Sequence, residues 1–253
     1  MPRRPPDRHD MRSPWPALDA AFESWELARI AEALDGPPGL AAFDADGTLW
    51  HGDVGEALLL ELIAEGRLLD PPSGDLFAEY ARRVEVDARD GFAFAVRLMA
   101  GLAVDEISQR AERIFATRFQ SQLFAPVVAL ARELTAKGWE LWIVSASNRW
   151  SVEPGARRLG IPAGRIAAVE LGVVGGRLNA EIATPLPTLE GKPELLRLRA
   201  GRGPELAFGN SLLDVPLLEA ARLAVAVGPR GGETALLREA GRRGWPRLRV
   251  ELP

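Results

Sequence analysis

The sequence predicts an α/β fold in which a parallel sheet is packed between helices and a helical segment is inserted after the first strand. Three observations indicate this organisation. Short apolar runs alternate with helical patterns from about residue 126 onward, which is typical of a parallel sheet. Residues 55–124 show helical patterns only, a segment large enough to form a small bundle. A single apolar run at residues 40–43 precedes this insertion and predicts a buried opening strand.

The N-terminal region differs in composition from the rest of the chain. Residues 1–16 are rich in proline and arginine, which predicts a disordered tail. The basic start leads into no long apolar stretch, so we expect no secretory signal and a cytoplasmic protein. Residues 17–34 then carry the apolar stripe of one helix, which the Pro- and Gly-rich residues 35–39 end.

The elements after the insertion follow from the spacing of apolar residues, which alternates between the 3.6-residue period of helices and the 2-residue period of strands. Helices are expected at residues 126–138, at 152–160, from 193 and at 212–221, and strands at 139–145, 165–171, 205–208 and 223–227. Residues 172–182 predict a β-hairpin, because Gly175 and Gly176 stand at its centre. The last twenty residues are ambiguous. We therefore expect a core of residues 17–54 and 125–253 and a helical cap of residues 55–124.

Composition excludes several kinds of site. The chain of 253 residues has no cysteine, which rules out disulfides, thiolate metal sites and a cysteine nucleophile. Its formal net charge of −4 gives no reason to expect nucleic acid or an anionic membrane as a partner. No apolar run approaches the length of a membrane span. The oligomeric state is left open by the sequence.

Polar residues follow three of the predicted strands at the point where each strand ends. They are Asp44 and Asp46 after the first strand, Ser145 after the second, and Asn210 with Asp214 after the strand at 205–208. Lys192 precedes Pro193 at the start of a predicted helix, where a cation is unfavourable unless an anion compensates it. Ligands bind at the carboxyl ends of parallel strands, so these groups predict a joint site for a metal and a phosphate.

Four segments resemble, in order, the motifs of the haloacid dehalogenase (HAD) superfamily of aspartate-nucleophile phosphatases. They are FDADGT at 43–48, IVSAS at 143–147, GKP at 191–193 and FGNSLLD at 208–214. The helical insertion resembles the cap of the phosphoserine phosphatase-like branch, which includes phosphorylcholine phosphatases. The resemblance implies a Rossmann-like parallel sheet core with an inserted helical cap. It also implies a Mg²⁺-dependent phosphomonoesterase that acts on a small phosphorylated metabolite through an aspartyl-phosphate.

The resemblance also implies a role for each residue. Asp44 would be the nucleophile and Asp46 the general acid and base. Ser145, with the amide of Ala146, would bind a phosphoryl oxygen, and Lys192 would neutralise charge on the nucleophile and the transferred group. Asp53 would either contact an amino group of the substrate or cap the first helix of the insertion. An arginine of the cap would hold a substrate carboxylate, for which Arg97 is the candidate.

The metal site implied by the resemblance departs from the family pattern at one position. Magnesium would bind Asp44, the carbonyl of Asp46 and an oxygen of the last motif, where Asn210 replaces the usual acid. Asn210 offers an amide oxygen without charge, and Asp214 becomes the expected charged partner, directly or through water. Two other functions stay open. One is haloalkanoate dehalogenation, which the acid at Asp46 disfavours, and the other is a non-catalytic phosphometabolite-binding protein, which Asn210 makes conceivable.

Overall fold

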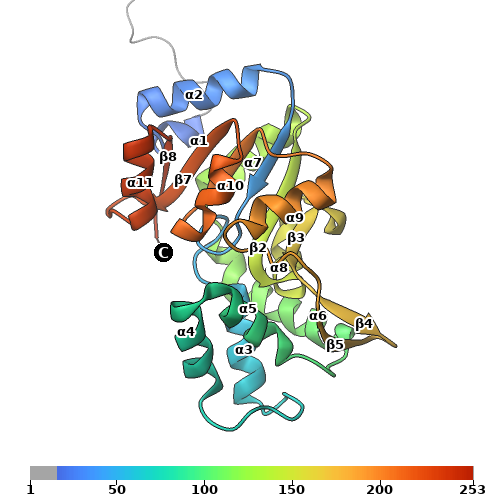
Figure 1. Cartoon of the computed structure of the whole chain (residues 1–253). Coiled ribbons are helices and arrows are strands. Elements are labelled where there is room, and N and C mark those ends of the chain that lie inside the picture. The colour runs from blue at the N-terminus through green and yellow to red at the C-terminus, as the bar shows by residue number, and fades with distance from the viewer. Residues whose placement is uncertain (1–15, 253) are drawn as a thin grey trace, which may run out of the picture.

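The computed structural model describes residues 16–252 of the chain. The predicted tail at residues 1–16 therefore lies outside the described residues, apart from Pro16. In the described part, six parallel strands form one sheet in the order β3-β2-β1-β6-β7-β8 (Figure 1). The strands are β1 (Leu40–Phe43), β2 (Glu140–Asn148), β3 (Ile166–Val169), β6 (Leu206–Gly209), β7 (Leu223–Pro229) and β8 (Arg247–Val250). The predicted α/β fold class is confirmed.

Helices cover both faces of this sheet, because consecutive side chains of a strand point to opposite faces. In β1, Leu40 and Ala42 contribute to one core, and Ala41 and Phe43 contribute to the other. The helices of the first core are α9 (Gly191–Ala200), α10 (Val215–Glu219) and α11 (Ala235–Arg243). The helices packed in the second core include α2 (Ser24–Asp35), α7 (Ala125–Ala136) and α8 (Arg149–Arg158). A strand buried on both faces explains the continuous apolar run that opens the motif.

The insertion between β1 and α7 is helical, as the sequence predicts. It contains α3 (Val54–Ala64), α4 (Leu76–Val86), α5 (Ala88–Arg97), α6 (Val104–Ile114), a π-helical turn (Phe115–Phe119) and a 3-10 turn (Gln120–Gln122). Three of its helices begin at an aspartate whose side chain accepts a backbone amide: Asp53, Asp75 and Asp87. Figure 1 shows α3, α4 and α5 together at one end of the molecule, away from α1 (Pro16–Asp19) and α2. The exact division into core and cap stays a prediction.

Apolar side chains join the insertion to the sheet in one continuous core. Trp50 packs edge-on against Phe115 with a ring-centroid distance of 5.1 Å. Gly155 of α8 lies against both rings, and a Cβ placed there would stand 2.4 Å from Trp50 and 2.7 Å from Phe115. This part of the insertion is therefore fixed to α8 by close packing.

Three local details differ from the sequence-based expectation or resolve it. The helix expected at 17–34 is two helices, α1 and α2, because Glu23 and Glu26 form a reciprocal capping box that starts a new helix at Ser24. The helix expected at 212–221 begins as a 3-10 turn, Leu212–Asp214, before α10. The ambiguous C-terminal residues form α11 and the edge strand β8.

The hairpin predicted at 172–182 is present as β4 (Leu171–Val174) and β5 (Arg177–Ile182). Gly175 and Gly176 both have positive φ, at 58° and 76°, which suits a two-residue hairpin turn.

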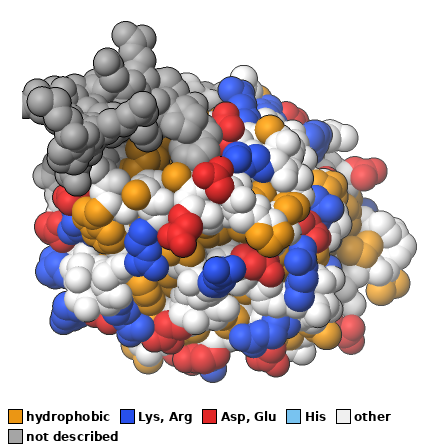
Figure 2. Space-filling view, turned by 90° about the horizontal axis from the view of Figure 1, so that it is seen from above, with side chains coloured by type: hydrophobic (Ala, Val, Ile, Leu, Met, Phe, Trp, Pro, Cys, Tyr) orange, Lys and Arg blue, Asp and Glu red, His pale blue; other side chains and the backbone are white. Residues whose placement is uncertain are grey.

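Seen from the side of α2, basic and acidic side chains are interspersed on the surface without a large area of one sign (Figure 2). No helix within residues 16–252 is both long enough and apolar enough to span a bilayer.

Candidate active site

The carboxyl ends of β1, β2 and β6 meet at one edge of the sheet. β1 is paired with both β2 and β6, and all three strands run parallel. The amide of Asp44 continues this pairing by donating to the carbonyl of Phe208 on β6. The sheet therefore brings three of the four motif segments together, and the start of α9 supplies the fourth.

A buried lysine joins the first motif to the last. Lys192 Nζ donates to Asp44 Oδ1 at 2.6 Å and also donates to Asp214 Oδ1. The relative exposures of Lys192, Asp44 and Asp214 are only 2%, 7% and 1%. Asp214 Oδ2 accepts the amides of Asn210 and Ser211 at 3.0 and 2.9 Å. Both oxygens of Asp214 are thus engaged, one with the lysine and one with the turn after β6.

Opposing effects set the ionisation of this group of three. Burial and the nearby Asp214 carboxylate raise the pKa of Asp44 to about 7, although the charge of Lys192 acts in the opposite direction. Burial alone would lower the pKa of Lys192, but the charges of Asp214 and Asp44 raise it above its ordinary value. Lys192 is therefore protonated at neutral pH and stays available to neutralise charge on Asp44.

Thr48 connects Asp44 with Asn210. The Thr48 hydroxyl donates to Asp44 Oδ2 at 2.9 Å and lies 3.3 Å from Asn210 Oδ1. The carboxylate and the amide oxygen thus lie on either side of the Thr48 hydroxyl. Gly47 permits this approach: its φ is +74°, and a Cβ there would stand 2.1 Å from Asn210 Nδ2.

Asp46 has a different set of partners from Asp44. Its Oδ1 accepts the indole N–H of Trp50 at 2.8 Å and the amide of Val54 at 2.9 Å, and its Oδ2 accepts the hydroxyl of Ser147 at 2.6 Å. Burial, with a smaller effect from the Asp53 carboxylate, raises the pKa of Asp46 to about 7. Asp46 is therefore poised to give and take a proton near neutral pH, as general acid–base chemistry requires.

The end of β2 presents two serines on one side of an extended segment. The Ser145 Oγ is buried and accepts the amide of Ser147 at 3.1 Å, which leaves the Ser145 hydroxyl proton free for another acceptor. Ala146 lies between the two serines and lines a cavity beside the site. Its expected contact with phosphate, and that of Ser145, stay predictions.

Asp53 starts α3, and its Oδ1 accepts the amide of Glu56 at 2.8 Å. The helix-capping interpretation of Asp53 is therefore confirmed. Asp53 also lines the cavity, and its Oδ1 is 3.4 Å from the Ser147 hydroxyl. The expected contact with a substrate amino group is compatible with this position and stays a prediction.

The residues at the sheet edge fit a magnesium ion. Asp44 and Asn210 supply oxygens on either side of the Thr48 hydroxyl, and Asp44 and Asp214 bring two buried acids against the single Lys192. Oxygen ligands and an excess of acid suit a hard divalent cation. Within residues 16–252, no three His, Asp or Glu side chains are arranged to hold a metal by themselves. The magnesium ligands implied by the resemblance, Asp44, the carbonyl of Asp46, Asn210 and Asp214, therefore stay a prediction.

Sequence reasoning gave no side-chain contact to three contributors, Thr48, Ser147 and Glu56, although it expected Thr48 to turn the chain with Gly47. Thr48 and Ser147 stand inside the quoted motifs, and Ser147 is two residues from Ser145, a spacing that places both side chains on one side of an extended chain. Glu56 is three residues from Asp53 at the start of a helix. These spacings were available in the sequence, but the partner that each side chain meets was not.

Comparisons with known proteins place the chain in one family. The model of the haloacid dehalogenase-like hydrolase family matches residues 41–219. A probable phosphatase of Mycobacterium tuberculosis is 35% identical over 136 residues, which are 52% of this chain and 45% of that protein. The chain thus spans about half the length of this curated relative.

Two solved structures resemble most of the described fold. A protein of unknown function from Bordetella pertussis Tohama I has a TM-score of 0.70 and 26% identity, covering 84% of this chain and 99% of that one. A substrate-bound phosphoserine phosphatase has a TM-score of 0.57 and 17% identity, covering 81% of this chain and 91% of that one, a likeness of fold alone. Since the matched residues 41–219 include all four motif segments, the chain belongs to the haloacid dehalogenase-like hydrolase family.

Proposed function

We propose that this protein is a magnesium-dependent phosphomonoesterase that acts on a small organic phosphate through an aspartyl-phosphate intermediate. The observation that supports this proposal most directly is that the two neighbouring acids, Asp44 and Asp46, have different partners. Asp44 is hydrogen-bonded to the buried, positively charged Lys192. Among the described residues, Asp46 has no basic partner and is held by the Trp50 indole N–H, the Val54 amide and the Ser147 hydroxyl. Family membership and the name of the mycobacterial relative, a probable phosphatase, support the same activity.

In the first half-reaction, a carboxylate oxygen of Asp44 attacks phosphorus and forms the aspartyl-phosphate. The bond from phosphorus to the ester oxygen breaks, and its electron pair stays on the leaving oxygen. Asp46 gives its proton to that oxygen, so the alcohol leaves neutral. Lys192 balances the charge on the nucleophile and on the transferred group, and the Ser145 hydroxyl donates to a phosphoryl oxygen.

In the second half-reaction, Asp46 works as a base. It takes a proton from a water molecule, whose oxygen attacks phosphorus and displaces the Asp44 carboxylate. Inorganic phosphate leaves, and both acids return to their starting states. Ser147 and the amide of Val54 hold the Asp46 carboxylate in place through both steps.

Magnesium would be held by the Asp44 carboxylate, the carbonyl of Asp46 and the Asn210 amide oxygen. When bound, it supplies positive charge that draws the phosphate to Asp44 and compensates the excess of buried acid. Asp214 would position this site indirectly, because one of its oxygens accepts from Lys192 and the other accepts the amide of Asn210.

Asp46 favours a phosphoester over a haloacid as the substrate. An alkoxide leaving group needs a proton, whereas a halide does not, and burial keeps Asp46 able to carry one at neutral pH. Release of chloride from a 2-haloacid without magnesium would reverse this assignment.

The decisive experiment replaces the nucleophile. Asp44→Asn should lower phosphate release from p-nitrophenyl phosphate by at least about a thousandfold, because the amide is a far weaker nucleophile. The same change at the exposed Asp105 serves as the control and should leave turnover intact. Retained turnover in Asp44→Asn, with a normal circular dichroism spectrum, would refute the assignment. Binding of orthovanadate by the wild type without any turnover would favour a non-catalytic role.

A further inference from the structure

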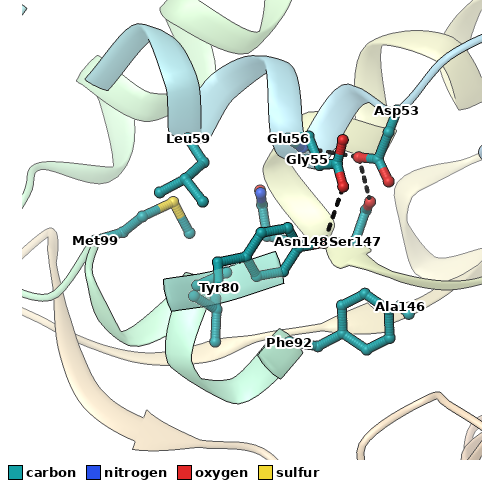
Figure 3. A pocket seen from close by; sticks show the side chains of 12 residues that line it. Asp53, Gly55, Glu56, Leu59, Tyr80, Phe92, Met99, Ala146, Ser147 and Asn148 are labelled. Carbon is teal, nitrogen blue, oxygen red and sulfur yellow. Dashed lines mark hydrogen bonds between the residues drawn. The ribbon is translucent and has the colours of Figure 1, made fainter. Parts of the chain in front are cut away.

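A small cavity lies between the insertion and the end of β2, directly beside Asp46. It is lined by twelve residues, which come from α3, α4 and α5 and from the end of β2 (Figure 3). Ser147 belongs to this lining and donates to Asp46 Oδ2 at 2.6 Å. Because Asp46 serves the leaving oxygen in the proposed reaction, the cavity is where the rest of the leaving group must lie.

Two acids face this cavity without a basic partner. Asp53 and Glu56 both line it, and no lysine, arginine or histidine is among the lining residues. In the part of the chain that the structure describes, no basic side chain forms an ion pair with either acid. Burial raises the pKa of Asp53 to about 6, so this group is still mostly ionised at neutral pH. Backbone amides and hydroxyl groups satisfy part of this negative charge, but no basic side chain of the described residues along the cavity balances it.

Aromatic and apolar side chains form the rest of the wall. Tyr80 of α4 and Phe92 of α5 lie with their ring centroids 6.4 Å apart, and the Tyr80 hydroxyl donates to Glu56 Oε1 at 3.2 Å. Figure 3 shows the carboxylates of Asp53 and Glu56 near each other, with Leu59 and Met99 on the opposite side of Tyr80. Carboxylates and aromatic rings that line the same cavity are the surroundings that an ammonium group prefers.

The path from the leaving oxygen to these acids is short. Ser147 Oγ is 2.6 Å from Asp46 Oδ2 and 3.4 Å from Asp53 Oδ1, so a single hydroxyl separates the two carboxylates. A positively charged nitrogen a few bonds from the ester oxygen would reach Asp53 while Asp46 donates its proton to that oxygen.

Within residues 16–252, the cavity lining has no basic side chain to pair with a carboxylate on the leaving group. Arg97, the cap arginine considered for that role, is exposed at the end of α5 and does not line the cavity. A leaving-group carboxylate placed beside Asp53 and Glu56 would meet like charges in a partly buried space, which is unfavourable.

We propose that the substrate is a phosphomonoester of a short amino alcohol, whose leaving group carries an ammonium nitrogen and no carboxylate. The carboxylates of Asp53 and Glu56 attract the positive charge, and Tyr80 and Phe92 pack against the carbon atoms attached to the nitrogen. This inference rests on the proposed phosphatase function and specifies its substrate class.

The test compares matched esters on the wild-type protein with magnesium, by phosphate release. O-Phosphoethanolamine is paired with the neutral propyl phosphate, and phosphocholine with the neutral 3,3-dimethylbutyl phosphate. At least one charged ester should exceed its neutral partner in kcat/KM by about ten- to a hundredfold, the range of a charge-assisted contact. O-Phosphoserine, which adds a carboxylate, should fall well below O-phosphoethanolamine.

The variants assign the discrimination to the cavity. Glu56→Gln should lower the charged-to-neutral ratio of kcat/KM about tenfold, because the amide no longer attracts the nitrogen. Glu85→Gln, an equal charge change on the exposed surface of α4, should leave that ratio as in the wild type. The ratio is internal to each protein, so partial misfolding does not affect it. Phe92→Leu gives a second route to a lowered ratio if Glu56→Gln does not fold.

The outcomes separate this inference from the proposed function. Hydrolysis of charged and neutral esters at equal rates would overturn the inference and leave the phosphatase assignment standing. Higher activity on O-phosphoserine than on O-phosphoethanolamine would also overturn it. Absence of hydrolysis of all these esters and of p-nitrophenyl phosphate would overturn the proposed function, and the inference with it.

Discussion

At the scale of single residues, the site solves the problem of placing acids at the end of a buried strand. An unpaired buried carboxylate is destabilising by several kcal/mol, so each acid needs its own compensation. Asp44 has Lys192 and the Thr48 hydroxyl, whereas Asp46 has two N–H donors and the Ser147 hydroxyl. The first set provides a fixed positive charge and the second does not. This difference suits one acid to nucleophilic attack and the other to proton transfer.

The separate roles of the two acids predict the behaviour of Asp46→Asn. With p-nitrophenyl phosphate, the leaving phenolate needs no proton, so the first half-reaction should continue while the second slows by about a hundredfold or more. Rapid mixing should then show a burst of nitrophenolate close to one per enzyme. With an alkyl phosphate the same variant should show no burst. Equal loss on both substrates, with no burst on either, would contradict the assignment of Asp46 as the leaving-group acid.

At the scale of elements, the starts of α3 and α9 add groups to the site that the carboxyl ends of the strands form. The first residue of α3 donates its amide to Asp46, and Gly55 allows α3 to approach β2, since a Cβ there would stand 2.6 Å from the Ser147 Oγ. At α9, a Cβ on Gly191 would stand 1.8 Å from the Leu186 carbonyl oxygen. This glycine therefore lets the loop close over the helix start that positions Lys192.

The junction between α8 and the insertion gives an element-scale prediction. Gly155→Ala should destabilise the protein by about 1–3 kcal/mol, because the added Cβ overlaps Trp50 and Phe115. Gly241→Ala in α11 is the matched control, since its Cβ would meet nothing within 4 Å. The control should stabilise by up to about 1 kcal/mol through helix propensity alone. Urea unfolding of both variants checks the pair, and stabilisation by Gly155→Ala would contradict the close packing.

At the scale of the whole molecule, the insertion closes the leaving-group cavity. The cavity volume is about 30 Å³, enough for only a few water molecules. The base of the insertion shares an apolar core with the sheet through Trp50 and Phe115. If the proposed leaving group binds in this space, we expect α4 and α5 to move relative to the sheet while the start of the insertion stays anchored.

The buried acids also make the stability of the whole fold depend on pH. Asp53 has a pKa of about 6 in the folded protein against an ordinary value of 3.8, so the folded state holds a proton more tightly. This contribution to stability is complete below about pH 4 and is lost as the pH rises through about 6. Asp53→Asn does not titrate there. In EDTA, the free energy of unfolding of Asp53→Asn, measured relative to that of the wild type, should therefore rise by about 1–2 kcal/mol from pH 4 to pH 7. This figure is smaller than the full pKa difference would give, because Asp53 is partly exposed to solvent.

Thermal or urea unfolding of the two proteins at several pH values measures this difference. Parallel pH profiles for the wild type and Asp53→Asn would show that Asp53 is not a buried acid of this kind. A difference of the opposite sign, with the variant losing stability as the pH rises, would contradict its raised pKa.

The sequence by itself determined the α/β fold class, the helical insertion and the four motif segments, and with them the family. These features depend on local periodicity and on residues a few positions apart, which a single strand end or helix start displays directly. The same local logic missed the break between α1 and α2, because the capping box of Glu23 and Glu26 competes with an otherwise continuous apolar stripe.

Only the tertiary structure decided which side chains meet across elements. It directs Asp214 to Lys192, places Ser147 between Asp46 and Asp53, and brings Glu56 and Tyr80 into one cavity while Arg97 stays outside. These residues lie far apart in the chain or on different helices, so no local pattern relates them. Their contacts follow from how the insertion packs on the sheet, where shape and burial select the partners.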